Sequence, residues 1–305
     1  MSAAIASPEQ APQPARTLGY WPRSFLRFVK QPVPVAALAA LAALFVAGAL
    51  APQLAPERWN SIDLSQRWHN HGPTLASHHW LGTDNIGRDV VVRTLWGLHN
   101  TEKTALLGAL LATLMGLLIG GLAGMYGGWI DALLMRVADL IAAFPAVVLV
   151  IAAFFFLSPL NAWKATALFA LYMWTQLARA LRSRVVEVDA SEYVEAARAL
   201  GAGNGRVFFR HVLPNVAGTV VIAATSLVGQ IVLIEATAEF FGFGIPSLVH
   251  PTLGNLLSDA TTSGIGAYNT VGLGWWVWGT PAIALVLILI CTNLIGDGLD
   301  NALNR

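Results

Sequence analysis

The chain has 305 residues, of which 56% are hydrophobic and only 11% are Asp, Glu, Lys or Arg. Soluble domains carry about 25% charged residues, so a chain this apolar has too little polar surface to cover a water-exposed exterior. The net charge of +1 argues against a nucleic-acid-binding protein. The single cysteine, Cys291, excludes an intramolecular disulfide. Composition therefore predicts an integral membrane protein.

Six apolar stretches predict transmembrane helices, because a hydrocarbon core of about 30 Å needs about 20 mostly apolar residues to cross it. They lie at about 33–50, 105–124, 140–157, 165–178, 216–234 (continuing towards 241) and 275–295. The fourth is short, and flanking residues such as Trp163 and Leu181 must extend it. Trp275, Trp276 and Trp278 open the sixth, as in an interfacial aromatic belt. The pattern predicts an all-α polytopic fold with six transmembrane helices.

The start of the chain leaves two interpretations of the first span. Residues 1–20 are rich in Ala, Pro and Gln, and we expect them to form a disordered tail. The first span is either a retained helix or a cleaved signal peptide, since Ala49, Leu50 and Ala51 resemble a small-residue cleavage site. The preceding segment of roughly 30 residues is long for a signal peptide, which favours a retained helix.

Lys and Arg in the loops indicate the orientation. With the N-terminus inside, twelve of the 18 Lys and Arg residues lie in inner segments and six in outer segments. The outer loop between the fifth and sixth spans, 242–274, contains neither Lys nor Arg. Five of the six outer basic residues fall in the first outer loop, and long loops count less in this rule. We therefore predict that both termini are cytoplasmic.

The longest and most charged inner loop, 179–214, joins spans four and five. Ser191 is a candidate N-cap for a short helix, with Glu192 in its first turn and Gly201 ending it. Pro214 suits the first turn of span five. One face of the short helix would hold Tyr193, Ala196, Ala197 and Leu200. Two interpretations fit, a solvated surface helix or a helix whose small residues permit close approach of another protein.

Here the sequence resembles the "EAA" signature of the permeases of ATP-driven (ABC) importers. The matching residues, at the spacing of the signature, are Glu195, Ala196, Ala197, Gly201, Leu213 and Pro214. His211 stands where the general pattern has Ile, but R-H-x-L-P-N is familiar in the peptide-importer branch. The resemblance implies that the 183–214 loop docks on a cytoplasmic ATPase subunit and couples its closure to rocking of the spans. ATP and Mg²⁺ would then bind the ATPase, and this chain would bind no cofactor.

Further matches extend the resemblance to about residues 30–305. They are 79–90, which is similar to the H-x-L-G-T-D-x-x-G-R-D-V segment, and 126–131, 144–145, 240–244 and 296–299. The chain most resembles the C-type permease of bacterial dipeptide, oligopeptide and nickel importers. This implies a type I ABC importer permease fold with a cytoplasmic tail (1–30), a first transmembrane helix (31–54), a periplasmic loop (55–104) and a five-helix core (105–305).

The same resemblance implies several partners: a B-type permease, two ATPase subunits or domains, a solute-binding protein outside, and the lipid of the inner membrane. Residues 245–255 depart from the Pro-rich stretch and Ser-Trp-Gly-x-Met segment that are usual in the family. The substrate therefore stays open among a dipeptide, an oligopeptide, a nickel chelate, a heme-like molecule and a modified peptide.

Two carboxylates at the outer end of span five, Glu235 and Glu239, lie one helical turn apart. Carboxylates at membrane depth are costly and usually functional, so they either face the translocation pathway or sit at the wet interface. The resemblance supports a carboxylate at Glu235, whereas the family more often has Ser at the position of Glu239.

Other features have mainly structural interpretations. Gly116, Gly120 and Gly124 form small-xxx-small pairs that predict close helix packing, with a sliding seam as the alternative. Arg136 and Asp139 are spaced for a local ion pair. Arg88 and Asp89 are predicted to cap and orient a surface helix leading into span two. Four histidines fall in the first outer loop without the spacing of a known metal motif, so we predict no metal site: His69, His71, His78 and His79.

No catalytic motif is present in the sequence. There is no G-x-x-x-x-G-K-[ST], G-x-S-x-G or H-E-x-x-H. We therefore predict a non-catalytic permease subunit. The alternatives are an intramembrane enzyme, which would need converging catalytic side chains in the spans, and a secondary transporter, which would normally show inverted repeats.

Overall fold

The computed structural model of the chain describes residues 20–55, 60–62, 73, 79–84, 87–157, 161–262 and 274–303. Most of these residues form helices: α1 (Tyr20–Val29), α2 (Pro32–Leu54), α3 (Val90–Tyr126), α4 (Gly128–Ala142), α5 (Ala146–Phe156), α6 (Ala162–Asp189), α7 (Glu192–Ala199), α8 (Asn204–Val207), the π-helical η2 (Phe208–Val212), α9 (Leu213–Phe240), α10 (Leu253–Thr262) and α12 (Trp275–Leu303). The prediction of an all-α fold is confirmed for this part of the chain. Residues 1–19 of the predicted tail and His69, His71 and His78 lie outside the described residues.

Four helical stretches are long and apolar enough to cross a membrane: Pro32–Leu54, Val90–Tyr126, Asn204–Phe240 and Trp275–Leu303. They contain the predicted first, second, fifth and sixth spans. The pair α4 and α5 makes a fifth crossing if the two helices are counted as one span. The predicted fourth span lies in α6, where Phe169, Met173 and Leu177 are almost fully buried. Its apolar part is short because the second half of α6 carries charged residues.

The second predicted span is only part of a longer helix. α3 begins at Val90, so residues 90–104 of the predicted outer loop are helical and continuous with the span. The Asp89 carboxylate accepts a hydrogen bond of 2.9 Å from the backbone N–H of Val92, which confirms the prediction that Asp89 caps this helix. The predicted surface helix and the predicted span are therefore one element.

The third predicted span is broken at Pro145. α4 ends at Ala142 and α5 begins at Ala146, with an 84° bend between them. Proline lacks a backbone N–H and its ring excludes the helical conformation of the preceding residue, so a helix cannot pass straight through it. The Tyr172 hydroxyl of α6 donates a 3.1 Å hydrogen bond to the carbonyl oxygen of Phe144, a polar group freed by the break.

Small residues let α3 and α6 approach closely. A β-carbon added at Gly120 would lie 2.5 Å from the backbone oxygen of Ala178, and one at Gly116 would lie 2.9 Å from Leu177. A β-carbon added at Gly124 would lie 2.6 Å from the side chain of Val185. The prediction of close packing through the small-xxx-small pairs of this helix is confirmed.

Polar groups also join α6 to α4. The Arg182 guanidinium donates two hydrogen bonds of 2.5 Å to the Asp131 carboxylate. Asp139 lies 3.5 Å from Arg179. The predicted local pair of Arg136 and Asp139 is therefore wrong, because Asp139 on α4 pairs with a residue of the neighbouring helix.

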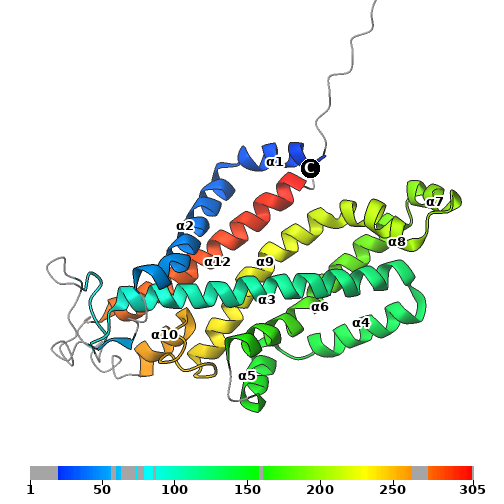
Figure 1. Ribbon diagram of the computed structural model, residues 1–305. Coiled ribbons are helices and arrows are strands. Elements are labelled where there is room, and N and C mark those ends of the chain that lie inside the picture. Colours follow the sequence, from blue (N-terminus) through cyan, green and yellow to red (C-terminus); the bar gives the residue numbers. More distant parts are fainter. Residues whose placement is uncertain are drawn as a thin grey trace, which may run out of the picture.

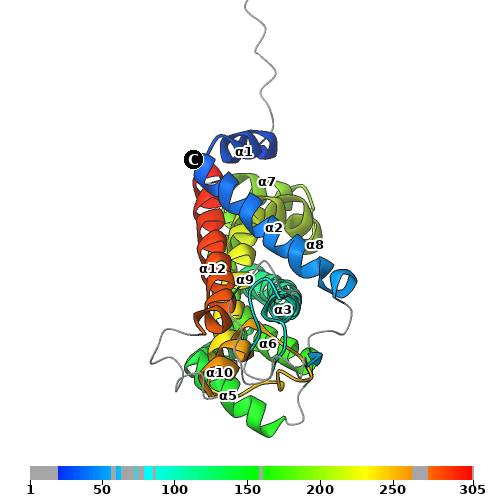
Figure 2. The ribbon, with the colours of Figure 1, turned by 90° about the vertical axis from the view of Figure 1, so that its left-hand side faces the viewer.

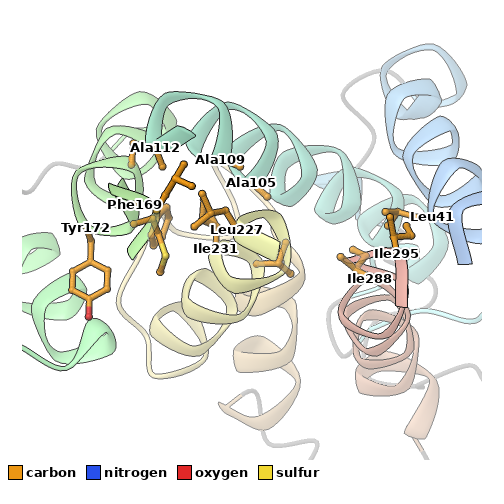
Figure 3. Close-up of a cluster of buried hydrophobic side chains, with 14 of the residues drawn as sticks. Leu41, Ala105, Ala109, Ala112, Phe169, Tyr172, Leu227, Ile231, Ile288 and Ile295 are labelled. Carbon is orange, nitrogen blue, oxygen red and sulfur yellow. The ribbon is translucent and has the colours of Figure 1, made fainter. Parts of the chain in front are cut away.

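The core lies where the long helices meet. Phe169 of α6 and Leu227 and Ile231 of α9 gather beneath the alanines of α3 (Figure 3). Leu41 of α2 meets Ile288 of α12 in a second part of the same cluster (Figure 3). Since lipid tails are as apolar as these side chains, shape complementarity rather than exclusion from water favours this packing in a membrane.

The molecule has two distinct ends. α7, α8, α1 and the end of α12 lie at one of them, which we call the α7 end (Figure 1). α10, the start of α3 and the end of α9 lie at the opposite one, which we call the α10 end (Figure 1). Figure 2 shows the same separation along α12, with α1 and α7 near one end of that helix and α10 near the other. The predicted coupling residues and the paired glutamates therefore lie at opposite ends of the bundle.

Candidate functional site

The predicted short helix of the 183–214 loop is present as α7. Ser191 has the extended conformation of an N-cap, but its side chain does not cap the helix; the hydroxyl donates 2.5 Å to the carbonyl oxygen of Val188 instead. Gly201 ends the helix with φ +89°, as predicted. The N–H groups of Gly201 and Ala202 bond to the carbonyl oxygens of Arg198 and Ala197, at 2.9 and 3.0 Å. This is the Schellman arrangement, which requires a left-handed residue at this point and therefore favours glycine.

Three contacts hold α7 against the bundle. Val194 is fully buried in the main core cluster. The Arg198 guanidinium donates 2.6 Å to the carboxylate of Asp189, the last residue of α6, and both side chains are partly buried. The Tyr193 hydroxyl lies 3.2 Å from the amide nitrogen of Asn215 on α9. Because these contacts involve both α6 and α9, a force applied to α7 reaches two of the long helices directly.

The rest of α7 is open. Leu200 is 90% exposed, and Tyr193, Glu195 and Ala196 are also exposed. A β-carbon added at Gly201, Gly203 or Gly205 would meet no atom within 4 Å. A single exposed leucine is common on protein surfaces, but this one stands beside small residues that permit close approach of another protein. Of the two interpretations of this helix, the geometry favours contact with another protein.

The segment after α7 joins the loop to span five without a break. α8, η2 and α9 follow one another from Asn204 to Phe240, and Pro214 lies at the first or second position of α9. Proline removes one N–H and crowds the carbonyl four residues earlier. The π-helical turn directly before it changes the hydrogen-bond pattern at this point, as π-turns inside helices do. Val207 and Val212 are fully buried, whereas Pro214 is exposed.

Both predicted pathway carboxylates are buried within the chain itself. Glu235 and Glu239, at the α10 end of α9, are 3% and 5% exposed, so neither lies at an exposed interface in this conformation. Glu239 accepts a hydrogen bond from the Thr252 hydroxyl and packs against Gly244 and Gly254. Glu235 Oε2 has no hydrogen-bond partner in the described part of the chain.

Charged side chains surround the start of α3 in an arrangement that we call the arginine clasp: the buried Asp84, Arg88 and Arg93, and the partly exposed Asp259. Arg88 Nε and Arg93 Nη1 both donate to Asp84 Oδ2, at 2.6 and 2.8 Å. Arg93 Nη2 donates 2.9 Å to Asp259 Oδ2 on α10. Burial and the charge of Arg93 lower the pKa of Arg88 from its ordinary value, against the opposing effect of Asp84. The charges of the two arginines and the two aspartates cancel. The arginine clasp also links α3 to α10.

The arginine clasp gives the 79–90 segment a structural role. Asp84 also accepts a 2.9 Å hydrogen bond from the Arg88 backbone N–H, and Gly87 between them has φ +85°. His79 bonds Asp89 at 2.7 Å, which orients the helix cap. Trp276 of α12 donates 3.2 Å to the carbonyl oxygen of Thr83. Arg88 therefore helps to orient the start of α3, as predicted, and it does so through its bond to Asp84.

A hollow of about 460 Å³ opens between the end of α9, residues 242–248 and α10. Its polar lining comes from Arg88, Glu239, Ser247, Asn255, Ser258 and Asp259. The Ser247 hydroxyl donates a 2.6 Å hydrogen bond to Asp259. Segment 245–255, whose sequence differs from the usual family pattern, is therefore bonded to the arginine clasp. Glu239 faces this hollow, and Glu235 lies one turn deeper along α9.

The sequence analysis missed two sets of residues. It did not single out Arg198 and Asp189, although opposite charges on both sides of the Ala190–Ser191 turn were a usable signal. It also treated Arg88 apart from Arg93 and Asp259. That cluster joins residues up to 166 positions apart in the chain, and no spacing rule brings them together.

Comparison of the sequence with known proteins gives a family match and several relatives. Residues 116–305 match the family described as binding-protein-dependent transport system inner membrane component. A peptide permease protein of Brucella suis biovar 1 is 35% identical over 289 residues, with 95% of this chain and 92% of that protein covered. The oligopeptide transport system permease protein OppC of Mycobacterium tuberculosis H37Rv is 34% identical over 284 residues, with 91% and 92% covered. The dipeptide transport system permease protein DppC of Alkalihalophilus pseudofirmus is 30% identical over 284 residues, with 93% and 89% covered.

Proposed function

Because this chain belongs to the family of binding-protein-dependent transport system inner membrane components and is a membrane-spanning, non-catalytic permease subunit of an ATP-driven importer, we propose that α7 is its coupling helix. The observation that supports this proposal is the exposed surface of α7 around Leu200, on a helix held to both α6 and α9. The predicted coupling residues contribute in different ways. Glu195 and Ala196 are exposed, Gly201 ends the helix, and Leu213 and Pro214 start α9.

We further propose that the α7 end is cytoplasmic and the α10 end periplasmic. The end of α12 and α1 lie at the α7 end (Figure 1), so both chain ends would face the cytoplasm. Two ATPase subunits, which bind ATP and Mg²⁺, would dock there, and this chain would bind no cofactor. A related B-type permease would supply the other half of the pathway, and a solute-binding protein would deliver substrate at the α10 end. The relatives named for peptide, oligopeptide and dipeptide transport support a peptide substrate.

Arg198 and Asp189 act as positioning residues in this proposal. Their 2.6 Å contact fixes the last turn of α7 relative to the end of α6, so that movement of the docked ATPase is transmitted to the bundle. The pair is partly exposed and contributes about 1 kcal/mol or less to stability. Its loss should therefore affect coupling more than folding. Reversing both charges, Arg198→Asp with Asp189→Arg, should restore part of the coupling that either single change removes.

Coupling is tested in the assembled complex, reconstituted in lipid nanodiscs with its ATPase, partner permease and binding protein. Leu200→Ser removes the exposed apolar contact, and Gly201→Val places a β-branched residue at φ +89°. We expect each to lower substrate-stimulated ATP hydrolysis at least tenfold, while the melting temperature of the Leu200→Ser protein stays unchanged. Leu140→Ser is the control, because Leu140 on α4 is 62% exposed and belongs neither to α7 nor to the hollow at the α10 end.

Two results would contradict the proposal. The first is that Leu200→Ser behaves like Leu140→Ser in both hydrolysis and retention of the ATPase subunits. The second is that no ATPase subunit co-purifies with the unaltered protein. Loss of coupling in Gly201→Val together with a large fall in melting temperature would indicate misfolding, so the comparison of the two leucine variants decides the question.

A further inference from the structure

α1 was not predicted from the sequence, which placed residues 1–30 in a tail. The helix is followed by a structured elbow in which the Gln31 N–H donates 2.9 Å to the carbonyl oxygen of Phe28. The Gln31 side chain donates 3.3 Å to the Gly298 carbonyl oxygen on α12. A β-carbon at Gly298 would lie 2.4 Å from Pro34 and 3.1 Å from Phe28, so the elbow is seated closely on α12.

The side chains of α1 and the elbow fall into three sectors, since successive residues of a helix are about 100° apart. Ser24 and Phe28 face the protein and are 4% and 7% exposed. The next sector is apolar but uncovered, with Phe25, Leu26 and Val29 at 66%, 48% and 50% exposure. The third sector holds the exposed basic residues Arg23, Arg27 and Lys30. No acidic residue occurs between residues 20 and 31.

The orientation of α1 fits a helix lying in the plane of a membrane. Figure 2 shows α1 lying crosswise at the end of α12, which is long and apolar enough to span. A bilayer around α12 would therefore meet α1 along its length, at the boundary between acyl chains and headgroups. A helix with one apolar face and one basic face is typical of such an interfacial position.

We propose that α1 binds anionic phospholipids of the leaflet at the α7 end, with Phe25, Leu26 and Val29 among the acyl chains and Arg23, Arg27 and Lys30 on the phosphates. The three positive charges without a negative one favour a lipid surface that is itself negatively charged. Neutral lipid would cover the apolar sector equally well but would leave the basic sector without a complementary charge. The bound lipid holds the elbow on Gly298 and so fixes the angle between α1 and the pair α2 and α12.

The test uses the full-length chain in nanodiscs. The chain has one cysteine, Cys291, which is buried, so a spin label can be placed at one site in a Cys291→Ser background. Labels are attached after Leu26→Cys or, separately, Arg27→Cys. In bilayers containing about one third phosphatidylglycerol, we expect the label at position 26 to be accessible to oxygen and the label at position 27 to be accessible to aqueous nickel chelate.

Charge dependence is tested with the triple variant Arg23→Gln, Arg27→Gln and Lys30→Gln. We expect it to retain no more than half as much phosphatidylglycerol as the unaltered protein after purification from mixed lipid. The label at position 26 should also become shallower, as it should for the unaltered protein in pure phosphatidylcholine. The control triple, Arg136→Gln, Arg184→Gln and Arg206→Gln, removes the same charge from exposed positions elsewhere and should change neither readout.

Three outcomes would overturn the proposal. Equal phosphatidylglycerol retention in the unaltered protein and the α1 triple would remove the role of the basic sector. An equal loss in the control triple would show a general charge effect rather than a site on α1. A label at position 26 that is shielded from both oxygen and nickel once partner subunits are added would show that a protein, not lipid, covers the apolar sector.

Discussion

α7 and α10 are both short helices at the ends of the same bundle, yet they are held in different ways. α10 buries Leu253, Leu256 and Ala260, and its start is bonded to α3 through Thr101. Gly254 lets its backbone approach that of α9. α7 buries only Val194 among its own residues and leaves Leu200 uncovered.

The charged contacts differ in the same direction. The arginine clasp places Asp84 and both arginines at about 5% side-chain exposure, whereas Arg198 and Asp189 are 34% and 20% exposed. A buried charge depends strongly on its partners, because water cannot replace them. A partly exposed pair is screened and easily resolvated. The contacts at the α10 end therefore fix α10 in one position, whereas α7 is held by fewer contacts and leaves most of its surface exposed.

Removing one charge from each end should give the largest difference in stability between them. Asp84→Asn leaves the buried guanidinium groups of Arg88 and Arg93 without their shared anion, and we expect a loss of about 3–5 kcal/mol in the free energy of unfolding. Asp189→Asn should cost about 1 kcal/mol or less. Thermal unfolding in nanodiscs, followed as loss of the monodisperse species, measures both. Similar melting temperatures for the two variants would show that the clasp is not a buried, mutually dependent network.

Glycine substitutions give a second, smaller test. A β-carbon at Gly254 would lie 2.6 Å from the Ala236 backbone, so Gly254→Ala must shift α10 and should cost about 1–3 kcal/mol. Gly205 in α8 has no atom within 4 Å of that position, and Gly205→Ala should leave stability unchanged or raise it by up to about 1 kcal/mol. Hydrogen exchange of peptides from 245–262 should rise only in the first variant. Unchanged exchange there would mean that α10 is not fixed by this contact.

The smallest expected effect is a pH dependence at the α10 end. Burial, together with the charges of Lys103 and His99, lowers the pKa of His250 below its ordinary value. Histidine in the unfolded chain takes up a proton at about pH 6.5, but His250 in the folded chain does so only at lower pH. The unfolded state therefore binds more protons between these two values, and stability is lost as the pH falls from about 6.5 towards the folded pKa.

His250→Gln should remove this part of the pH dependence. The melting temperatures of the unaltered and variant proteins should run parallel above about pH 7, and the unaltered protein should fall more steeply between pH 6.5 and 5. Parallel curves over the whole range would show that His250 can be protonated in place, and that the α10 end accommodates a charge at this position.

The class of protein and its main helices could be predicted from the amino-acid sequence alone. The apolar stretches predicted the helices because helices satisfy their own backbone hydrogen bonds in lipid. Gly201 predicted the end of α7, since the Schellman arrangement needs a left-handed residue. Gly116, Gly120 and Gly124 predicted a close helix contact. In each case the physical rule acts within one helix or turn, so residues near in sequence were sufficient.

The contacts between these helices could not be predicted in the same way and are seen only in the folded chain. Asp139 pairs with Arg179 rather than with Arg136, and Arg93 pairs with Asp259, which lies 166 positions further along the chain. α1 was included in the predicted tail because its ten residues are too few to span a membrane. Its position is fixed by the elbow that packs against Gly298 of α12, which the sequence does not reveal. The partners of a charged side chain or a short amphipathic helix depend on which long helices pack beside it. The spacing of residues along the chain does not specify these partners, whereas the packing of the long helices does.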